Sequence, residues 1–352
     1  MPLNATYKKK VFHFGFDART SRGRMKDKTA WFIKLWDSKQ PNVVGWGECG
    51  PLPGLSVDDR PDFESVLDSC LAHVSAIQHQ EDIVKIVPAG FPSIRFGLEA
   101  ALLDLRHGGV RKIYNNSFFS GTPIPINGLV WMGDLDSMLQ QVSLKIAQGF
   151  RCIKLKVGGL NFEKECDILQ YIRSKYFREG ITIRLDANGA FKPEEAKYKL
   201  NSLARYNVHS IEQPVKPGLV AMEELCRSSP IPIALDEELI GVALKADKIK
   251  LLDRIRPQFI ILKPSLHGGL LSCAEWIALA EERNIGWWIT SALESNIGLN
   301  AICQFTANYT ITMPQGLGTG KIYQDNIPSP LTVSEGTISY DAKKSWDIQE
   351  PL

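Results

Sequence analysis

Three acidic residues end short apolar stretches of this sequence at nearly equal intervals, and this spacing constrains the fold more than any other feature. Asp186 ends Ile-Arg-Leu-Asp, Glu212 ends Ser-Ile-Glu, and Asp236 ends Ile-Ala-Leu-Asp, so the gaps are 26 and 24 residues. One strand, one helix and two loops occupy about 25 to 30 residues in an alternating α/β chain. The pattern therefore predicts parallel strands whose carboxyl ends bring the three carboxylates together on one face.

The alternation of strands and helices extends over about residues 122–320. Beyond the three carboxylates, the predicted strand ends are Leu129, Lys156, Lys263 and Thr290. Seven or eight such units favour a closed parallel barrel over an open sheet. The last strand is expected around residues 309–313.

The first 120 residues have a different pattern. Residues 6–16 and 29–37 alternate in polarity as β-strands do, and helical periodicity follows over about 59–79 and 93–106. The polar, basic residues 17–28 are expected to form a flexible lid that closes over substrate. We expect three parts: an α+β domain at 1–120, a barrel at 121–320, and a tail at 321–352 that packs back on the first domain.

Composition narrows the class of protein. The chain has 352 residues, 44% of them hydrophobic, which is enough for one large buried core with a smaller second domain. Its 41 basic and 39 acidic residues nearly balance, so we expect neither a nucleic-acid nor a membrane partner. The sequence shows no long apolar run, no secretory signal and no CxxC pair among its seven cysteines, so we expect a reduced, cytoplasmic protein.

Carboxylates that lie together without a cation repel one another and destabilise a fold. Asp186, Glu212 and Asp236 therefore predict a shared hard divalent cation, Mg²⁺, with Mn²⁺ as a substitute. Taken singly, each of these residues is more typical of a helix N-cap or a loop. Asn188 fits the metal shell and the cap of the next helix about equally, and Glu237 is expected to point away from the metal.

Lysines flank the carboxylates in the sequence. Lys154 and Lys156 end the preceding apolar stretch, and residues i and i+2 of a strand point to the same side, so both are expected at the barrel mouth. Lys263 ends the stretch that follows the carboxylates. An amine near a cation and a second amine has a lowered pKa and can act as a general base. The alternatives are exposed surface lysines and, for Lys263, a structural ion pair.

A base beside a metal suggests removal of a proton alpha to a carboxylate. Two loops are candidates for binding that carboxylate through hydroxyls and backbone N–H groups, residues 290–298 and residues 264–269. Ordinary helix capping explains the first loop almost as well. The candidate substrate contacts are Ser291, Glu294, Ser295, Asn188, Ser265 and Arg22.

The ordered motifs Lys-x-Lys, Asp-Ala-Asn, Ile-Glu-Gln-Pro, Leu-Asp-Glu and Leu-Lys-Pro closely resemble those of the muconate-lactonizing-enzyme subgroup of the enolase superfamily. The resemblance covers essentially the whole chain. It implies an α/β fold, a modified TIM barrel (β/α)7β with an N-terminal α+β capping domain, and Mg²⁺ bound by Asp186, Glu212 and Asp236. A lysine base beside Mg²⁺ is typical of this superfamily.

Within the subgroup, residues 291–299 and 263–269 look like those of the o-succinylbenzoate synthases. The resemblance implies a carbon–oxygen lyase of menaquinone biosynthesis, which dehydrates 2-succinyl-6-hydroxy-2,4-cyclohexadiene-1-carboxylate to 2-succinylbenzoate through an enediolate. It also implies that Lys156 removes the alpha proton, that Lys263 stabilises the enediolate, and that Lys154 lowers the pKa of Lys156. One departure is Glu238, where a serine is common in the family.

Other activities stay open from the sequence. An N-acylamino acid racemase or dipeptide epimerase of the same superfamily would use Lys156 and Lys263 as bases on two faces, although dipeptide epimerases typically carry an Asp-x-Asp segment that this sequence lacks. A Schiff-base aldolase would need a lysine but not three carboxylates, and a scaffold barrel would need neither. The expected partner is a small-molecule carboxylate, and both monomer and homo-oligomer stay open.

Overall fold

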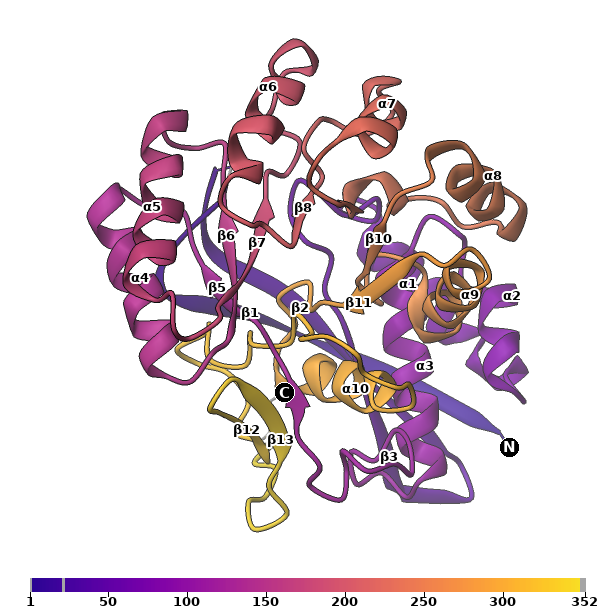
Figure 1. The fold of residues 1–352 in the computed structure, drawn as a ribbon. Helices are drawn as coiled ribbons and strands as arrows, with labels where there is room; N and C mark the ends of the chain where they lie inside the picture. Colours follow the sequence, from indigo (N-terminus) through magenta and orange to yellow (C-terminus); the bar gives the residue numbers. More distant parts are fainter. Residues whose placement is uncertain (1, 21–22, 349–352) are drawn as a thin grey trace.

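The computed structural model describes residues 2–20 and 23–348, which form a curled parallel sheet, an N-terminal antiparallel sheet, and the helices that cover them (Figure 1). The parallel sheet has the strand order β11-β10-β9-β8-β7-β6-β5. Its strands are β5 (Gly128–Val130), β6 (Cys152–Lys156), β7 (Thr182–Asp186), β8 (Ser210–Glu212), β9 (Ile233–Leu235), β10 (Phe259–Leu262) and β11 (Gly286–Ile289). The helices that follow them are α4 (Leu135–Ala147), α5 (Phe162–Lys175), α6 (Pro193–Ala204), α7 (Ala221–Ser228), α8 (Lys245–Ile255), α9 (Gly269–Glu281) and α10 (Asn296–Thr306). Within the described residues, no helix combines the length and apolar content that crossing a bilayer requires.

A two-residue segment closes the ring of strands in place of a full eighth strand. Ile126 forms a parallel bridge with Gln315, and Thr290 forms one with Gly316. Backbone hydrogen bonds of 2.8 to 3.1 Å join Gln315 and Gly316 to the chain beside β5 and β11, which are the two edges of the sheet. The modified TIM barrel that the sequence predicts is thereby confirmed.

The prediction of a last strand at residues 309–313 is wrong. The ring of Tyr309 packs edge-on against Trp287 and Phe305, with ring centroids 5.3 and 5.4 Å away, so this stretch packs between β11 and α10. The apolar side chains that give the segment a strand-like pattern serve this packing instead. The barrel is closed by Gln315 and Gly316, two residues after this stretch.

The register of the parallel strands places their last residues side by side. Lys156 pairs with Asp186, and Asp186 pairs with Glu212. The other residues of these strands include Leu155 and Leu185, which are buried in the hydrophobic core. Period-2 alternation therefore places apolar side chains in the core and leaves the charged ones on the inner side of the barrel.

The N-terminal region is an antiparallel sheet covered by helices. Its strands are β1 (Leu3–Thr20), β2 (Gly23–Asp37) and β3 (Gln40–Cys49), and its α-helices are α1 (Phe63–Ala72), α2 (Ile83–Ile86) and α3 (Pro92–Arg106). Helix α3 lies so close to β3 that a Cβ atom added at Gly45 or Gly47 would be 2.1 or 1.8 Å from a backbone oxygen of α3. Only glycine allows this approach, which explains the Gly-Trp-Gly sequence.

The segment that the sequence predicts to be a flexible lid is the outer end of the β1–β2 hairpin. Its described residues, 17–20 and 23–28, are strand, with a register irregularity between His13 and Ala18. The expectation of a loop is wrong because the two strands satisfy each other's backbone groups, so polar side chains do not prevent strand formation. Closure of the hairpin over substrate stays a prediction.

The tail returns across both parts of the molecule. The ring of Tyr323 lies 5.1 Å from that of Phe12 and 5.0 Å from that of Phe14, both on β1. The tail also adds a small antiparallel sheet made of β12 (Leu331–Ser334), β13 (Thr337–Tyr340) and β4 (Ile124–Pro125). The division into domains at residues 120 and 320 stays a prediction.

Two buried glutamates of the N-terminal region bind the N-termini of barrel helices. Glu48 of β3 accepts hydrogen bonds from the Ser295 hydroxyl at 2.5 Å, the Ser295 amide at 2.8 Å and the Gly298 amide at 2.9 Å, at the start of α10. Glu99 of α3 accepts hydrogen bonds from the amides of Leu270 and Leu271 in α9. Because such amides have no partner within their own helix, the two carboxylates satisfy them and fasten the N-terminal region to the barrel.

The Glu99 contact gives a test of pH-dependent stability. Burial raises the pKa of Glu99 to about 8, against the lowering effect of its backbone hydrogen bonds. The unfolded chain ionises this group at the usual lower pH, so between about pH 5 and pH 8 unfolding releases a proton and the native state loses stability as pH rises. We expect the difference in melting temperature, Glu99→Gln minus wild type, to increase by several degrees as pH rises over this range. Scanning calorimetry measures both temperatures. A difference that stays constant with pH would show that Glu99 is ionised throughout.

Candidate active site

Six charged side chains lie together at the carboxyl ends of β6 to β10. The lysines are Lys154, Lys156 and Lys263, and the acidic residues are Asp186, Glu212 and Asp236. The three carboxylates are at most 1% exposed, and Lys154 and Lys263 are 7% and 8% exposed. Three positive and three negative charges therefore share one buried site, where each must find a partner of opposite sign.

Each carboxylate of this cluster lies against a lysine. The Lys154 amine is 2.8 Å from Asp186 Oδ2 and 2.5 Å from Glu212 Oε2, and the Lys156 amine donates to Asp186 Oδ2 at 2.5 Å. On the other side of the cluster, the Lys263 amine donates to Asp236 Oδ2. The pairs form two groups from β6 to β10: Lys156, Asp186, Lys154 and Glu212 on one side, and Asp236 with Lys263 on the other.

Asn188 connects the first of these groups to a fourth carboxylate. Its Oδ1 accepts a hydrogen bond from the Lys156 amine at 2.8 Å, and its Nδ2 donates to Glu237 Oε1 at 2.9 Å. Asn188 has a left-handed backbone, with φ of 45°. Asn188 thus lies beside Lys156, and Glu237 lies behind Asn188.

The two lysines of β6 have opposite pKa shifts. Burial lowers the pKa of Lys156, and the positive charge of Lys154 lowers it further, against the attraction of Asp186. Burial also acts on Lys154, but Asp186 and Glu212 outweigh it and raise its pKa. Lys154 therefore holds its proton more tightly, while Lys156 releases one more readily, as a general base requires.

The oxygens of the carboxylates fit a hard divalent cation. Glu212 Oε1 and Asp236 Oδ1 are buried without a hydrogen-bond partner, whereas Glu212 Oε2 lies 2.5 Å from the Lys154 amine. Burial and the charge of Asp186 raise the pKa of Glu212 well above its usual value, a shift that a cation would oppose. Among the described residues, no three His, Cys, Asp or Glu side chains form a preassembled metal cluster, because each carboxylate here is turned toward a lysine.

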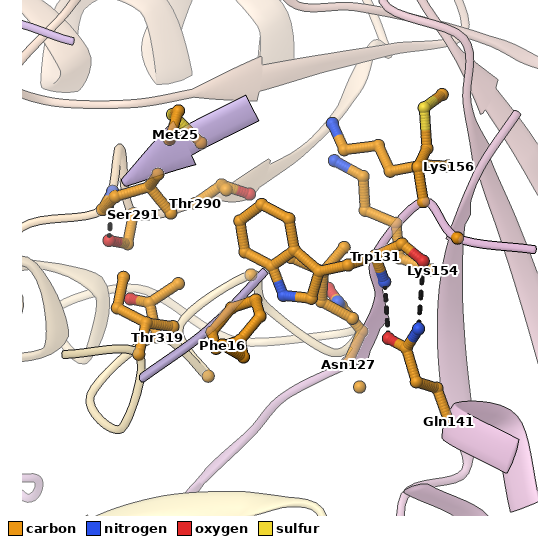
Figure 2. Close-up of a pocket in the computed structure, with 18 of the residues that line it drawn as sticks. Phe16, Met25, Asn127, Trp131, Gln141, Lys154, Lys156, Thr290, Ser291 and Thr319 are labelled. Atoms are coloured by element: carbon orange, nitrogen blue, oxygen red, sulfur yellow. Dashed lines mark hydrogen bonds between the residues drawn. The ribbon is translucent and has the colours of Figure 1, made fainter. Parts of the chain in front are cut away.

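A cavity of about 830 Å³ opens at this end of the barrel (Figure 2). Lys154, Lys156, Lys263 and Asn188 line the cavity, whereas the three carboxylates are not among its lining residues. The rest of the wall comes from both the hairpin and the barrel, and includes Phe16, Met25, Trp131, Thr290, Ser291 and Thr319. A ligand in the cavity would therefore meet the amines directly.

Sequence reasoning missed an aromatic pair in this cavity. Trp131, which follows β5, lies in the middle of Figure 2, and its ring centroid is 5.2 Å from that of Phe16 on the hairpin. Gln141 of α4 holds the Trp131 backbone, because its Oε1 accepts from the Trp131 amide at 2.9 Å and its Nε2 donates to the Trp131 carbonyl at 3.2 Å. The available signal was the position of Trp131 just past a predicted barrel strand, where side chains reach the mouth.

Ser265, Glu294 and Ser295, which the sequence puts forward as substrate contacts, are not among the lining residues of the cavity. Glu294 accepts hydrogen bonds from the hydroxyls of Ser265 and Ser291, both at 2.5 Å, and from the Ala292 amide at 2.8 Å. Ser295 is bonded to Glu48, as described above. Ser291 lies on the cavity wall, but its hydroxyl is directed to Glu294, and Arg22 lies outside the described residues.

The expectation that backbone N–H groups of two loops bind a substrate carboxylate stays a prediction, but several of these groups already have acceptors in the protein. The amides of residues 291–295 all donate to protein acceptors. The amides that begin α9 donate to Glu99. Acceptors of the protein itself, among them the carboxylates of Glu48, Glu99 and Glu294, therefore hold these amides, as helix capping does.

The charge balance of the cluster gives a stability test. Lys263→Met would leave the buried Asp236 carboxylate without its partner, at a cost of about 3 to 5 kcal/mol. We expect a large fall in melting temperature. Circular dichroism measures this temperature, with a chelator present so that no metal ion contributes. Adding Asp236→Asn removes the orphaned charge and should recover most of the loss. A double variant as unstable as the single variant would contradict the pairing.

Comparisons of sequence place the chain among known enzymes. The profile of the family "Enolase C-terminal domain-like" matches residues 137–344. An o-succinylbenzoate synthase from Desulfotalea psychrophila is 41% identical over 96% of this chain and 98% of its own length. An o-succinylbenzoate synthase from Yersinia pseudotuberculosis is 25% identical over 87% of each chain.

Solved structures agree with these matches. The crystal structure of MenC from Desulfotalea psychrophila has a TM-score of 0.82 and 40% identity, and the match covers 96% of this chain and 100% of that chain. A dipeptide epimerase from Cytophaga hutchinsonii, complexed with Mg and D-Ala-L-Val, also has a TM-score of 0.82, over 100% of this chain and 97% of that chain, but its 21% identity shows the fold alone. The resemblance seen in the motifs is confirmed: this chain belongs to the o-succinylbenzoate synthase family of the enolase superfamily.

Proposed function

We propose that the protein dehydrates 2-succinyl-6-hydroxy-2,4-cyclohexadiene-1-carboxylate to 2-succinylbenzoate, and that the lysine–carboxylate cluster is its active site. The observation that supports this most directly is the placement of Lys156 and Lys263. Both line the cavity, one at the end of β6 and one just after β10, with Asp186, Glu212 and Asp236 on the strands between them. A carboxylic acid held between these lysines would present its alpha carbon to an amine.

Lys156 is the proposed base. Its amine removes the proton from C1 of the ring, and the electron pair passes into the attached carboxylate to give the enediolate. The C6–OH bond then breaks, a ring double bond forms, and the Lys156 ammonium returns the proton to the departing hydroxide as water. One residue serves both steps, because a syn elimination loses the proton and the hydroxyl from the same face.

The other two lysines are proposed to stabilise negative charge. Burial lowers the pKa of Lys263, but Asp236 and Glu212 outweigh burial and raise it, so this amine stays protonated beside the substrate. Lys154 is held in its charged form by Asp186 and Glu212 and lies against the base. Fixed positive charges in a water-poor site stabilise an enediolate without reorganising during the reaction.

We propose Asp186, Glu212 and Asp236 as the ligands of Mg²⁺, which when bound supplies positive charge to the substrate carboxylate. The unpartnered Oε1 of Glu212 and Oδ1 of Asp236 fit this role. Asn188, held by Glu237, would keep Lys156 and Asp186 in place through its hydrogen bonds to both. Phe16, on the hairpin, packs with Trp131 over the cavity and would shield the ring from water.

Metal binding has its own test. We expect wild-type protein to bind one Mg²⁺ in calorimetry and Glu212→Gln to bind it at least about tenfold more weakly, because one anionic ligand is lost. Glu179→Gln, a change at an exposed position after α5, serves as the control. Equal affinity of wild type and Glu212→Gln would remove Glu212 from the ligand set.

The reaction is tested by following the diene absorbance of the substrate with Mg²⁺ present. We expect fast loss of the diene band with wild-type protein, and a rate at least about a thousandfold lower for Lys156→Ala, because the general base is missing. Lys197→Met, at an exposed position of α6, should keep the wild-type rate.

A specific outcome would favour the other activity of this superfamily. Lys156 and Lys263 on two sides of the carboxylates also suit two-base racemisation of N-acylamino acids. Exchange of the alpha hydrogen of such substrates for deuterium by wild-type protein, without loss of the diene band, would replace the dehydratase proposal by a racemase or epimerase.

A further inference from the structure

The cavity extends beyond the lysine–carboxylate cluster into a second polar region. This region lies between α4 and residues 316–322, and its polar lining residues include Asn127, Thr319, Lys145 and Lys321. In Figure 2 the side chains of Asn127 and Thr319 lie below the indole of Trp131, and the amines of Lys154 and Lys156 lie above it. The proposed proton transfer uses none of the four residues.

Two atoms of this region are buried without a partner. Asn127 and Thr319 are only 5% and 7% exposed, yet Asn127 Oδ1 and Thr319 Oγ1 form no hydrogen bond with any described residue. The two walls that carry them are close, because a Cβ atom added at Gly318 would lie 3.4 Å from the Asn127 carbonyl oxygen. Buried polar groups in proteins are nearly always hydrogen-bonded. The Thr319 hydroxyl can donate to a bound ligand, whereas Asn127 Oδ1 can only accept and needs a donor.

The same region carries positive charge without a counterion. Lys145 of α4 is partly buried, and its amine lies 5.3 Å from the centre of the Phe150 ring. Burial lowers the pKa of Lys145, and the positive charge of the exposed Lys321 lowers it further. Within residues 2–20 and 23–348, neither lysine forms an ion pair or a hydrogen bond with another side chain.

The other cations that line the cavity do have carboxylate partners. Arg24 of the hairpin is 2.5 Å from Asp17, and the three lysines of the cluster are paired as described above. Helix N-termini near the mouth are also occupied, because Glu48 and Glu99 accept their amide protons. Lys145 and Lys321 are therefore the positive charges of the cavity that remain for an anion.

We propose that Asn127, Thr319, Lys145 and Lys321 form a second anion subsite, which binds the carboxylate at the end of the substrate's succinyl chain. This inference rests on the proposed function, whose substrate has one carboxylate on the ring and one on this chain. The Thr319 hydroxyl would donate a hydrogen bond to the carboxylate, and the two lysines would supply charge. Asn127 Oδ1 is an acceptor and would take a hydrogen bond from a lysine amine. Trp131 then lies between the two subsites, where the apolar part of the acyl chain passes.

The proposed subsite would contribute to substrate binding but not to the proton transfer at Lys156. The ring carboxylate lies at the lysine–carboxylate cluster, and the distal carboxylate fixes the orientation of the ring by holding the far end of the molecule. We therefore expect changes in the subsite to raise KM and to leave kcat close to the wild-type value.

The test compares two ligands on three proteins. In 2-butyrylbenzoate a methyl group replaces the distal carboxylate of 2-succinylbenzoate, and the two ligands are otherwise alike. We expect the double variant Lys145→Met/Lys321→Met to bind 2-succinylbenzoate about tenfold more weakly than wild type, as a competitive inhibitor, because charge-assisted contacts are lost. Its affinity for 2-butyrylbenzoate should be unchanged. Lys197→Met, which removes a lysine outside the cavity, should leave both affinities unchanged.

A second variant covers the case in which the double variant folds poorly. Thr319→Val keeps the shape of the side chain and removes the hydroxyl, so we expect it to weaken 2-succinylbenzoate several-fold more than 2-butyrylbenzoate. Unchanged binding of 2-succinylbenzoate by both variants, or equal weakening of the two ligands by Thr319→Val, overturns the subsite. Failure of wild-type protein to consume the diene overturns the proposed reaction instead, so the two failures are distinguishable.

Discussion

Three lysines and three carboxylates, buried together where five consecutive strands end, form the interaction on which the rest of this structure depends. An unpaired charge in such a place would cost several kcal/mol, whereas the pairs from β6 to β10 leave no net charge. The parallel register makes this possible, because it sets Lys156 beside Asp186 and Asp186 beside Glu212. The barrel is thus built around a charge pattern that apolar packing alone would not select, and the same pattern gives one lysine a lowered pKa.

The N-terminal region is joined to the barrel by the electrostatics of helix ends. Glu48 and Glu99 accept hydrogen bonds from the first amides of α10 and α9, so each buried carboxylate has donors and each helix start has an acceptor. The contact also has a consequence for ligand binding. Two positions near the mouth that could have attracted an anion are already filled by the protein, and the proposed anion contacts are accordingly amines of the cavity wall.

Local sequence patterns predicted the parts of the structure that depend on local physics. The strand ends at Lys156, Asp186 and Glu212 all follow from periodicity. The same patterns could not show which distant groups fill a helix start. Nothing local in residues 290–298 indicates that Glu48, more than 240 residues earlier, binds their amides. The contact of Phe16 with Trp131 and the closing bridges of Gln315 and Gly316 are likewise set by the assembled fold.

The short closing segment has a wider consequence. Residues 315 and 316 complete the ring, Thr319 and Lys321 line the cavity, and Tyr323 packs on β1, so one continuous run of nine residues connects the barrel, the cavity and the hairpin. None of the six charges of the cluster belongs to this run. A change of residues here would alter the shape and charge of the ligand site while the proton-transfer groups keep their register. Under the proposed function, the proton-transfer groups lie at the ends of β6 to β10, whereas residues 315–323 shape the part of the cavity that selects the ligand. Each stretch of sequence can then change while the other is retained.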